Sequence, residues 1–551
     1  MLVFPLQNKV DINLESLSNE IGSFLVKNVT WVNGFNIVKG FLNLNIHDLF
    51  YVNFLKSIHL QKHYGHKPID KNKGITLVEF SSPNTNKPLH LGHIRNNLLG
   101  DSITRILKAN GYEAIKTQII NDRGIHICKS MISWLKFAKD STPESTGIKP
   151  DKFVGNYYVL FEKEYQKQIK ILIEKGYKKG DAEKKAPIFL EAKKMLKKWE
   201  SGDKKTIELW KKMNSWVYEG FDKTYESLGI EFDKNYYESE TYLKGKKIVQ
   251  KGITKQIFYQ KKDNTICIDL TENGLDEKVL IRSDGTSVYI TQDIGTAIQR
   301  FEDYPQLKGM IYTVGNEQEY HFKTLFLVLK KIGFKWTNKL HHLSYGMVDL
   351  PDGKMKSREG NVVDADDLML KMKMKAEEIS SDLGKLEGYS KVEKNKLYKK
   401  ISLGALKYYI LKVDPKKRIL FDPEKSIDFN GNTGPFVQYT YARIQSILKN
   451  NHINANIGTP NKIDSKEVLI IKQLINYPEV IEQALKTYSP ALISNYIYEL
   501  VKRFNSFYQN ISILGAKELV TKNFRLMLLR NVALNLRNSC ALLGISLPNR
   551  M

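Results

Sequence analysis

The chain has 551 residues, of which 85 are Lys or Arg and 60 are Asp or Glu, so its formal net charge is +25. The length allows about three or four domains and is ample to bury several hydrophobic cores. The basic balance favours a polyanionic partner such as RNA, because each phosphate contact releases condensed counterions. A coding bias toward AT-rich codons would also enrich lysine, so the charge supports this class of partner without establishing it.

Composition excludes a membrane span and a disulfide framework. The sequence has no run of about 18 apolar residues and no signal peptide, so we expect a cytoplasmic protein without a membrane partner. The three cysteines, Cys128, Cys267 and Cys540, are odd in number and widely separated. They form neither a disulfide pattern nor a zinc pattern, and we expect no metal site in the protein.

Residues 1–70 are expected to form a small α+β domain. Within this segment, VTWVNGFNIVKGFLNLNI (residues 29–46) alternates enough between apolar and polar residues to predict two short strands.

A phosphate site is predicted in the next segment. A strand (ITLVEF, 75–80) leads through the loop SSPNTNKP (81–88) into an amphipathic helix that Asn110-Gly111 closes, and a second strand follows at 114–120. This strand–helix–strand unit is of Rossmann type. The N-terminus of a helix favours anions, so we expect phosphates beside His90 and His93, while Gly92 would allow a base or ribose to approach closely.

Charged helices are predicted over about 140–234, inserted between the two halves of the nucleotide fold. Their charge runs are explained as solvated helix faces. Residues 283–297 then predict a turn at Asp284-Gly285, a short strand at 287–291 and a helix that opens near Asp293.

Tyr289 and Asp293 could face one pocket from that junction. A guanidinium substrate needs a carboxylate and a planar or hydroxyl partner, and these two side chains supply both. The alternative stays open that Asp293 caps a helix and Tyr289 is a core strand residue.

Residues 343–368 predict a strand, a Pro-Asp-Gly turn, a basic loop and the start of a helix. Lys354, Lys356 and Arg358 on this loop could close over a triphosphate and neutralise its charge. Beyond it we expect a helical connector at 371–430 and an α-helical domain at 431–551. In the latter, Phe436, Gln438, Tyr439 and Arg443 could stack on and bond to unpaired bases, although aromatic residues at helical spacing are more often core residues.

The string VEFSSPNTNKPLHLGHIRNNLLGDSI (78–103) resembles the HIGH region of class I aminoacyl-tRNA synthetases. Ser82-Pro83-Asn84 and Lys87-Pro88 make it similar to the arginyl-tRNA synthetase version, of bacterial type. Residues 354–358 resemble the KMSKS loop, but the third and fourth residues are exchanged. GFLNLNI (40–46) and ALLGISLPNRM (541–551) resemble parts of the N-terminal tRNA-contacting domain and the anticodon-binding bundle of the same family.

The resemblance implies an α/β fold, with a Rossmann-type parallel-sheet catalytic domain at 71–370, and an arginine–tRNA ligase activity. Its partners would be L-arginine, ATP with Mg²⁺ brought by the nucleotide, and the tRNA for arginine, with no DNA. The enzyme would be a monomer, would acylate the terminal 2′-hydroxyl of the tRNA, and would need bound tRNA to activate arginine.

The resemblance also implies the site residues. ATP would be bound by Lys87, His90, Gly92, His93, Lys354, Lys356 and Arg358, with both histidines and the three lysines catalytic. Lys87 would compensate for the altered loop. Arginine would be bound by Glu79, Ser82, Asn84, Tyr289, Asp293 and Gln318, and tRNA by Phe436, Gln438, Tyr439 and Arg443.

Three other functions stay open. A class I synthetase of different specificity would share both motifs but should lack the SPNxxKP string. A small-molecule nucleotidyltransferase would also use HxGH, but would have little use for a basic helical C-terminal domain. A non-catalytic RNA-binding paralogue predicts loss of active-site residues, whereas all those named are present.

Overall fold

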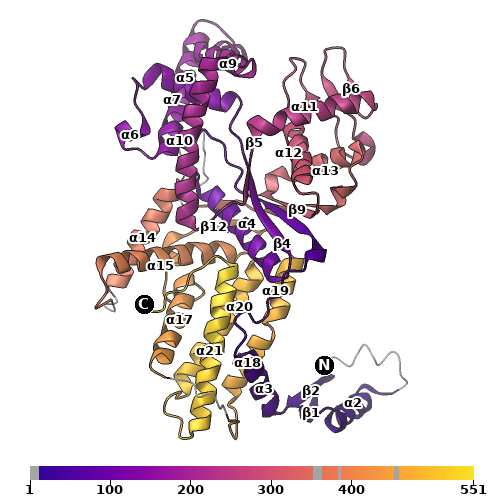
Figure 1. The fold of residues 1–551 in the computed structure, drawn as a ribbon, viewed down its shortest axis with the longest axis vertical. Coiled ribbons are helices and arrows are strands. Elements are labelled where there is room, and N and C mark those ends of the chain that lie inside the picture. Colours follow the sequence, from indigo (N-terminus) through magenta and orange to yellow (C-terminus); the bar gives the residue numbers. More distant parts are fainter. Residues whose placement is uncertain (1–11, 352–362, 383–385, 452–457) are drawn as a thin grey trace.

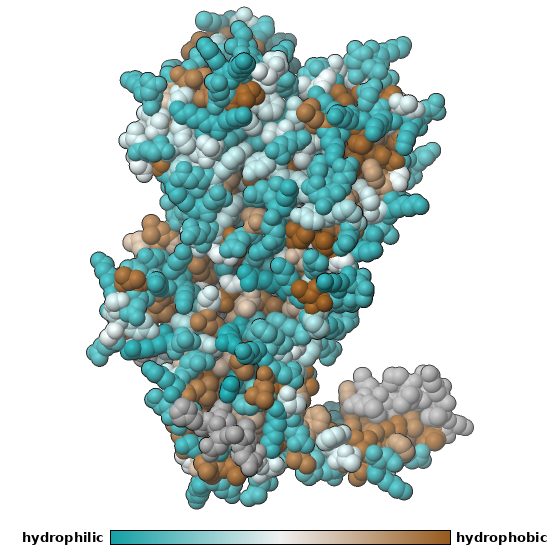
Figure 2. Space-filling view, viewed as in Figure 1, coloured by the Kyte–Doolittle hydropathy of each residue, from teal (hydrophilic) through white to brown (hydrophobic). Residues whose placement is uncertain are grey.

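The computed structural model describes residues 12–351, 363–382, 386–451 and 458–551. Figure 1 shows a central sheet with two lobes on one side of it and a helical bundle on the other. A small N-terminal unit projects from the far end of the bundle. Along the described ranges, no helix combines the length and the apolar content that a membrane span requires. Hydrophilic residues cover most of the face seen in Figure 2.

The central sheet has five parallel strands, in the spatial order β10-β9-β3-β4-β5. The strands are β3 (Ile75–Glu79), β4 (Glu113–Ile120), β5 (Lys234–Tyr237), β9 (Leu307–Gly315) and β10 (Leu340–Tyr345). Along the chain, β4 and β5 are added on one side of β3, and β9 and β10 are then added on its other side. The order therefore reverses between β3 and β9, and ligands of such sheets bind at the carboxyl ends of the strands at this point.

The predicted strand–helix–strand unit is confirmed as β3, α4 (Leu91–Ala109) and β4. Asn110 caps α4, and Gly111 follows with a φ of +81°, in the left-handed region that favours glycine. The apolar face of α4 is buried in the main hydrophobic core. This packing fixes the position of the helix N-terminus at the reversal of the sheet.

The charged segment between β4 and β5 is helical, as predicted. Its helices are α5 (Ile125–Phe137), α6 (Pro143–Thr146), α7 (Pro150–Glu174), α8 (Lys179–Lys185), α9 (Pro187–Glu200) and α10 (Lys204–Leu228). They form one of the two upper lobes in Figure 1. Helix α7 packs directly on the motif loop, because a Cβ at Gly155 would lie 2.9 Å from Cδ of Pro88.

The second lobe lies between β5 and β10. It contains α11 (Glu238–Thr254), α12 (Tyr289–Asp303) and α13 (Glu319–Ile332), with the antiparallel strands β6 (Tyr259–Gln260), β7 (Ile266–Ile268) and β8 (Lys278–Ile281). Short 3₁₀ turns occur at η1 (Lys71–Lys73), η2 (Thr271–Asn273), η3 (Asn316–Gln318) and η4 (Lys335–Lys339).

The predicted strand at 287–291 is wrong, because α12 already begins at Tyr289. The β-branched residues of this segment favour a strand locally, but packing against α11 decides otherwise. The two helices approach so closely that a Cβ at Gly245 would lie 1.9 Å from the carbonyl oxygen of Thr291. Asp293 is consequently inside the helix, and the alternative in which it caps the helix is also wrong.

The C-terminal part of the chain is helical, as predicted. The short strand β11 (Val348–Asp349) comes before the helices α14 (Ala365–Asp382) and α15 (Lys391–Leu411). It pairs in parallel with β12 (Ile419–Leu420), which follows these helices and leads to the turn α16 (Pro423–Ser426). The bundle consists of α17 (Gly434–Lys449), α18 (Ser465–Ile475), α19 (Tyr477–Lys486), α20 (Ala491–Asn510) and α21 (Leu519–Leu542).

The N-terminal unit contains the two predicted strands, β1 (Val32–Val38) and β2 (Phe41–Ile46), packed against α2 (Leu14–Asn28). The next helix, α3 (Asp48–Ile58), packs on the bundle instead. The Ile463 amide donates to the carboxylate of Asp48, and Asn538 donates to the carbonyl of Lys62.

Candidate active site

The N-terminus of α4 holds two imidazoles at the reversal of the sheet. The ring centroids of His90 and His93 lie 4.0 Å apart. Nδ1 of His90 accepts the Gly92 amide at 3.1 Å, and Nδ1 of His93 accepts the His90 amide at 3.2 Å. A nitrogen that accepts carries no proton, so each neutral ring presents an Nε2–H donor.

Both imidazoles are neutral near pH 7. Burial, followed by the charge of Lys87, lowers the pKa of His90 to about 3. Burial, followed by His90 and Lys87, lowers the pKa of His93 well below its usual value. The pair can therefore donate hydrogen bonds to phosphate oxygens without itself carrying charge, and Lys87 supplies a cation beside it.

Gly92 serves this arrangement in a way that the sequence did not indicate. A Cβ at this position would lie 2.9 Å from Cε1 of His90. The glycine therefore leaves room for the His90 ring to fold back over the helix N-terminus. The sequence suggested instead that it admits a base or ribose.

The loop after β3 is held in an uncommon backbone conformation. Ser81 and Ser82 have φ values of +73° and +48°, which non-glycine residues rarely adopt. The amide of Ser81 donates to the side chain of Asn96 on α4, and its hydroxyl pairs with Tyr225 on α10 at 2.7 Å. Such strain persists only where the surroundings enforce it, and it is typical of ligand sites.

The carboxylate of Glu79, at the end of β3, is buried and already has partners. It forms an ion pair with Arg300 of α12 and accepts the hydroxyl of Ser82 at 3.2 Å. The sequence predicted Glu79 as an arginine ligand but gave no sign of this internal guanidinium. Asn84, by contrast, is exposed, and it forms a parallel bridge with Asn121 at the end of β4.

Tyr289 and Asp293 lie one turn apart on α12, as a shared pocket requires. The carboxylate of Asp293 keeps 38% of its surface exposed and bonds Nε2 of His321 at 2.6 Å. Burial lowers the pKa of His321, but Asp293 raises it more, so the net shift is upward. Gln318 is exposed at the end of β9, three residues before His321.

Sequence reasoning missed a third carboxylate at the carboxyl end of β5. Glu238 begins α11, is buried, and lies close enough to Asp293 for the two charges to interact. Burial, followed by nearby carboxylates, raises the pKa of Glu238 to about 8, against the opposing charge of Arg123. A strand that ends directly before a glutamate (NYYESE, 235–240) was the available signal.

The three cationic residues of the basic loop, Lys354, Lys356 and Arg358, lie outside the described residues. The residues that follow the loop border the motif. Val363 accepts the amide of Leu91, and Asp364 forms an antiparallel bridge with His90. Within the described ranges, no three His, Cys, Asp or Glu side chains are grouped so as to hold a metal ion.

Comparison with known proteins now assigns the fold and the site to a family. Residues 55–422 match the catalytic domain of class I (R) tRNA synthetases, and residues 437–551 match the DALR anticodon-binding domain. The chain is 55% identical to an arginine–tRNA ligase of Flavobacterium psychrophilum, over 100% of this chain and 93% of that protein. A second such ligase, from Parabacteroides distasonis, is 51% identical with the same coverage. The chain belongs to the class I arginyl-tRNA synthetases.

Solved structures show the same fold. The arginyl-tRNA synthetase of Thermus thermophilus matches with a TM-score of 0.80 at 22% identity, over 100% of this chain and 94% of that chain. The arginyl-tRNA synthetase of Plasmodium falciparum matches with a TM-score of 0.75 at 21% identity, over 97% and 89%. The predicted fold class, with a parallel-sheet catalytic domain and a helical C-terminal domain, is confirmed.

Of the four predicted RNA contacts, Gln438 lies in the core of the bundle and the other three are partly exposed. Gln438 is fully buried, and its amide donates to the carbonyls of Lys400 and Ser546. Arg443 donates to Asn505 at 2.9 Å, and its guanidinium lies 5.0 Å from the ring centre of Tyr439. Phe436 is half-buried against the core. The amide of Gln438 therefore bonds within the protein, whereas Phe436, Tyr439 and Arg443 keep part of their surface accessible.

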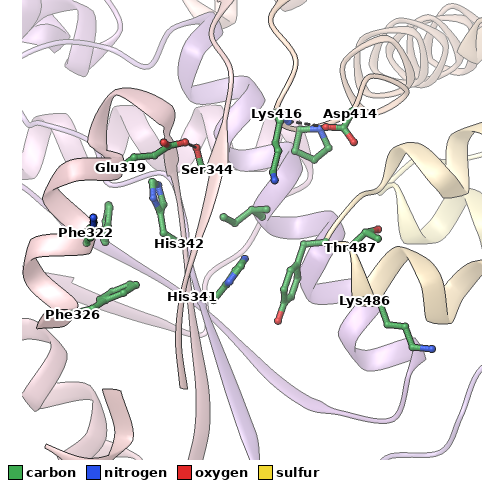
Figure 3. Close-up of a pocket in the computed structure, with 14 residues that line it drawn as sticks. Glu319, Phe322, Phe326, His341, His342, Ser344, Asp414, Lys416, Lys486 and Thr487 are labelled. Atoms are coloured by element: carbon green, nitrogen blue, oxygen red, sulfur yellow. Dashed lines mark hydrogen bonds between the residues drawn. The ribbon is translucent and has the colours of Figure 1, made fainter. Parts of the chain in front are cut away.

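Two hollows of the synthetase lie outside the pocket at the reversal of the sheet. One, of about 450 Å³, lies between α17 and α21 and is lined by Tyr441, Gln445, Arg530, Arg537 and Asn549 among others. The other, of about 780 Å³, runs along the edge strand β10, between α13 and the bundle. Figure 3 shows His341 and His342 on its floor and Lys416 pointing into it. The Glu319 carboxylate on its wall already accepts the hydroxyl of Ser344.

Proposed function

We propose that the protein activates L-arginine with ATP and transfers the arginyl group to the terminal adenosine of its tRNA. The observation that carries the proposal is a neutral imidazole pair at the N-terminus of α4, together with two carboxylates, Asp293 and Glu238, close enough for their charges to interact. The names of its relatives agree with this activity.

In the first step, the arginine carboxylate attacks the α-phosphate of ATP, the bond to the β-phosphate breaks, and pyrophosphate leaves. His90 and His93 donate from Nε2 to phosphate oxygens, and Lys87 balances the growing charge. The sequence assigns charge neutralisation of the pyrophosphate to Lys354, Lys356 and Arg358, and Mg²⁺ would be brought by the triphosphate. In the second step, a terminal hydroxyl of the tRNA attacks the carbonyl of the adenylate, and AMP leaves.

Arginine is selected by charge pairing. Its guanidinium replaces the proton that Glu238 holds and competes with His321 for Asp293, with Tyr289 as a further partner. Glu79, Ser82, Asn84 and Gln318 complete the pocket. A neutral analogue could neither displace the proton of Glu238 nor form an ion pair with Asp293, so it would gain none of this binding energy.

The tRNA lies along the bundle, and the hollow between α17 and α21 takes an unpaired base. Arg530 and Arg537 are exposed two helical turns apart on one face of α21 and supply charge there. We further propose a monomer, and a cytoplasmic location because the substrates are cytoplasmic solutes.

ATP–pyrophosphate exchange with each amino acid in turn, with and without tRNA, tests the proposal. We expect exchange with arginine alone among the amino acids, and only when tRNA is present. Exchange with another amino acid would support a synthetase of different specificity. Exchange with none, together with no retention of bulk tRNA in filter binding, would support a small-molecule nucleotidyltransferase.

A further inference from the structure

A buried guanidinium lies beneath the proposed arginine pocket. Arg300 follows Asp293 by seven residues on α12, so the two side chains share one face of the helix, two turns apart. Arg300 is fully buried, with 0% of its surface exposed. Asp293 and Arg300 therefore lie on the same face of α12, and the guanidinium of Arg300 reaches the end of β3.

The surroundings of Arg300 make Glu79 its only carboxylate partner among the described residues. Nη1 of Arg300 pairs with Glu79, and the guanidinium lies 5.0 Å from the ring centre of Tyr236 and 5.8 Å from that of Tyr312. Nε and Nη2 have no hydrogen-bond partner within the described part of the chain.

We infer that Arg300 is a positioning residue for arginine binding, which holds one oxygen of Glu79 and so aims the other at the substrate. Among the described residues, that second oxygen accepts only the Ser82 hydroxyl, from the strained loop after β3. Without Arg300, the buried Glu79 would lose its countercharge and the contact that fixes its orientation. The inference rests on the proposed function, because it requires arginine to bind beside Glu79.

A purely structural role is the competing explanation. Replacing a buried ion pair with apolar side chains is often neutral or stabilising, so stability alone gives little reason for this pair. The two roles also predict different kinetics. A structural role affects folding and all substrates alike, whereas a positioning role affects the binding of arginine and leaves that of ATP nearly unchanged.

The test compares Arg300→Met, Arg300→Lys, Glu79→Gln and the double variant Glu79→Gln/Arg300→Met by ATP–pyrophosphate exchange with tRNA at one fixed pH. We expect Arg300→Met to raise the KM for arginine about tenfold or more, the loss of one charge-assisted contact, with the KM for ATP within about twofold. Arg300→Lys should restore most of the arginine affinity.

The double variant decides whether Arg300 acts through Glu79. If it does, Arg300→Met should add no further loss of arginine affinity once Glu79→Gln is present. Lys407→Met is the matched control, because Lys407 is another buried basic residue but lies on α15 rather than α12. This variant should leave the KM for arginine unchanged.

Two results would overturn the inference: equal increases in both KM values, or a loss of arginine affinity in Glu79→Gln/Arg300→Met that equals the sum of the two single losses. If Arg300→Met does not fold, as circular dichroism would show, Arg300→Gln takes its place, and an additive loss in Glu79→Gln/Arg300→Gln overturns the inference instead. Wild-type protein without arginine-dependent exchange would overturn the proposed function rather than this inference.

Discussion

At the scale of single residues, burial decides which chemistry each side chain of the site can perform. His90 and His93 are neutral donors because burial and Lys87 disfavour their charged forms. Glu238 holds a proton near neutral pH, while the more exposed Asp293 has a titratable histidine as its partner. These differences separate phosphate binding from guanidinium binding within one pocket.

Asp293→Ala should cost about 3–5 kcal/mol of arginine recognition, about two to four orders of magnitude in kcat/KM. The variant would leave the guanidinium of the substrate without its most accessible carboxylate. Steady-state exchange kinetics with varied arginine measures the loss. Asp263→Ala, an exposed carboxylate of the same lobe, is the control and should change nothing. A loss below tenfold for Asp293→Ala would contradict its role.

Glu238 should make arginine binding depend on pH. Its pKa of about 8 means that the carboxyl is mostly protonated below pH 8, and arginine needs the ionised form. Between pH 6.5 and 8 we expect kcat/KM for arginine to rise, with an apparent pKa of about 8 in the unliganded enzyme. Glu238→Gln should lower kcat/KM and remove this rise. A pH profile that is unchanged in Glu238→Gln would assign the titration to another group.

At the scale of elements, local propensity succeeds where packing agrees with it and fails where packing opposes it. Apolar spacing predicted α4, and that face is buried. The segment 287–291 has β-branched residues, yet it opens α12, since the glycines of α11 and α12 allow the two backbones to touch. The same contact places Asp293 and Arg300 on one face toward the site.

The helical insertion supports the phosphate corner through α7. Gly155→Val should push Pro88 and the adjoining Lys87 out of place, because even a Cβ would lie 2.9 Å from Cδ of Pro88. We expect the rate of adenylate formation to fall about tenfold or more, by misplacement of a catalytic cation, with little change in the KM for arginine. Single-turnover exchange measures this rate.

Gly180→Val in α8 is the control, since a Cβ there meets nothing within 4 Å. It carries the same β-branched side chain within the same insertion. If both variants lose activity equally, the loss reflects instability of the insertion rather than displacement of Lys87.

At the scale of the whole molecule, one side chain joins the site to the segment that leads into the bundle. Arg95, one turn after His90 on α4, donates to the carbonyls of Gly346, Pro415 and Lys417 at 2.7, 3.0 and 2.7 Å. Arg95 is fully buried, and its hydrogen bonds hold α4, the end of β10 and the connector together. These bonds lie within the catalytic domain, residues 55–422, and α4 reaches the anticodon-binding domain further along, where the Ser102 hydroxyl donates to the carbonyl of Leu542.

Arg537→Ala should weaken tRNA binding without damaging the catalytic pocket. Loss of one contact with a base or phosphate should raise the Kd for tRNA by about tenfold and reduce its dependence on salt. Filter binding at several salt concentrations measures both quantities. Lys502→Ala, an exposed lysine elsewhere on the bundle, is the control. Equal effects from the two variants would indicate general charge attraction rather than a site between α17 and α21.

The sequence by itself determined the family, the Rossmann-type unit, the helical C-terminal domain and the identity of the motif residues. These follow from short-range patterns: apolar spacing, a capped helix after a strand, and histidines at a fixed interval. Such patterns depend on neighbours along the chain, which a sequence displays directly.

Only the tertiary structure decided what surrounds those residues. In the fold, Arg300 pairs with Glu79, and His321 bonds to Asp293. Glu238 lies near Asp293, and Gln438 is buried in the core. The physical reason is that burial and pairing depend on contacts between residues far apart along the chain. Those contacts set the charge and the accessibility of each side chain, and with them its role.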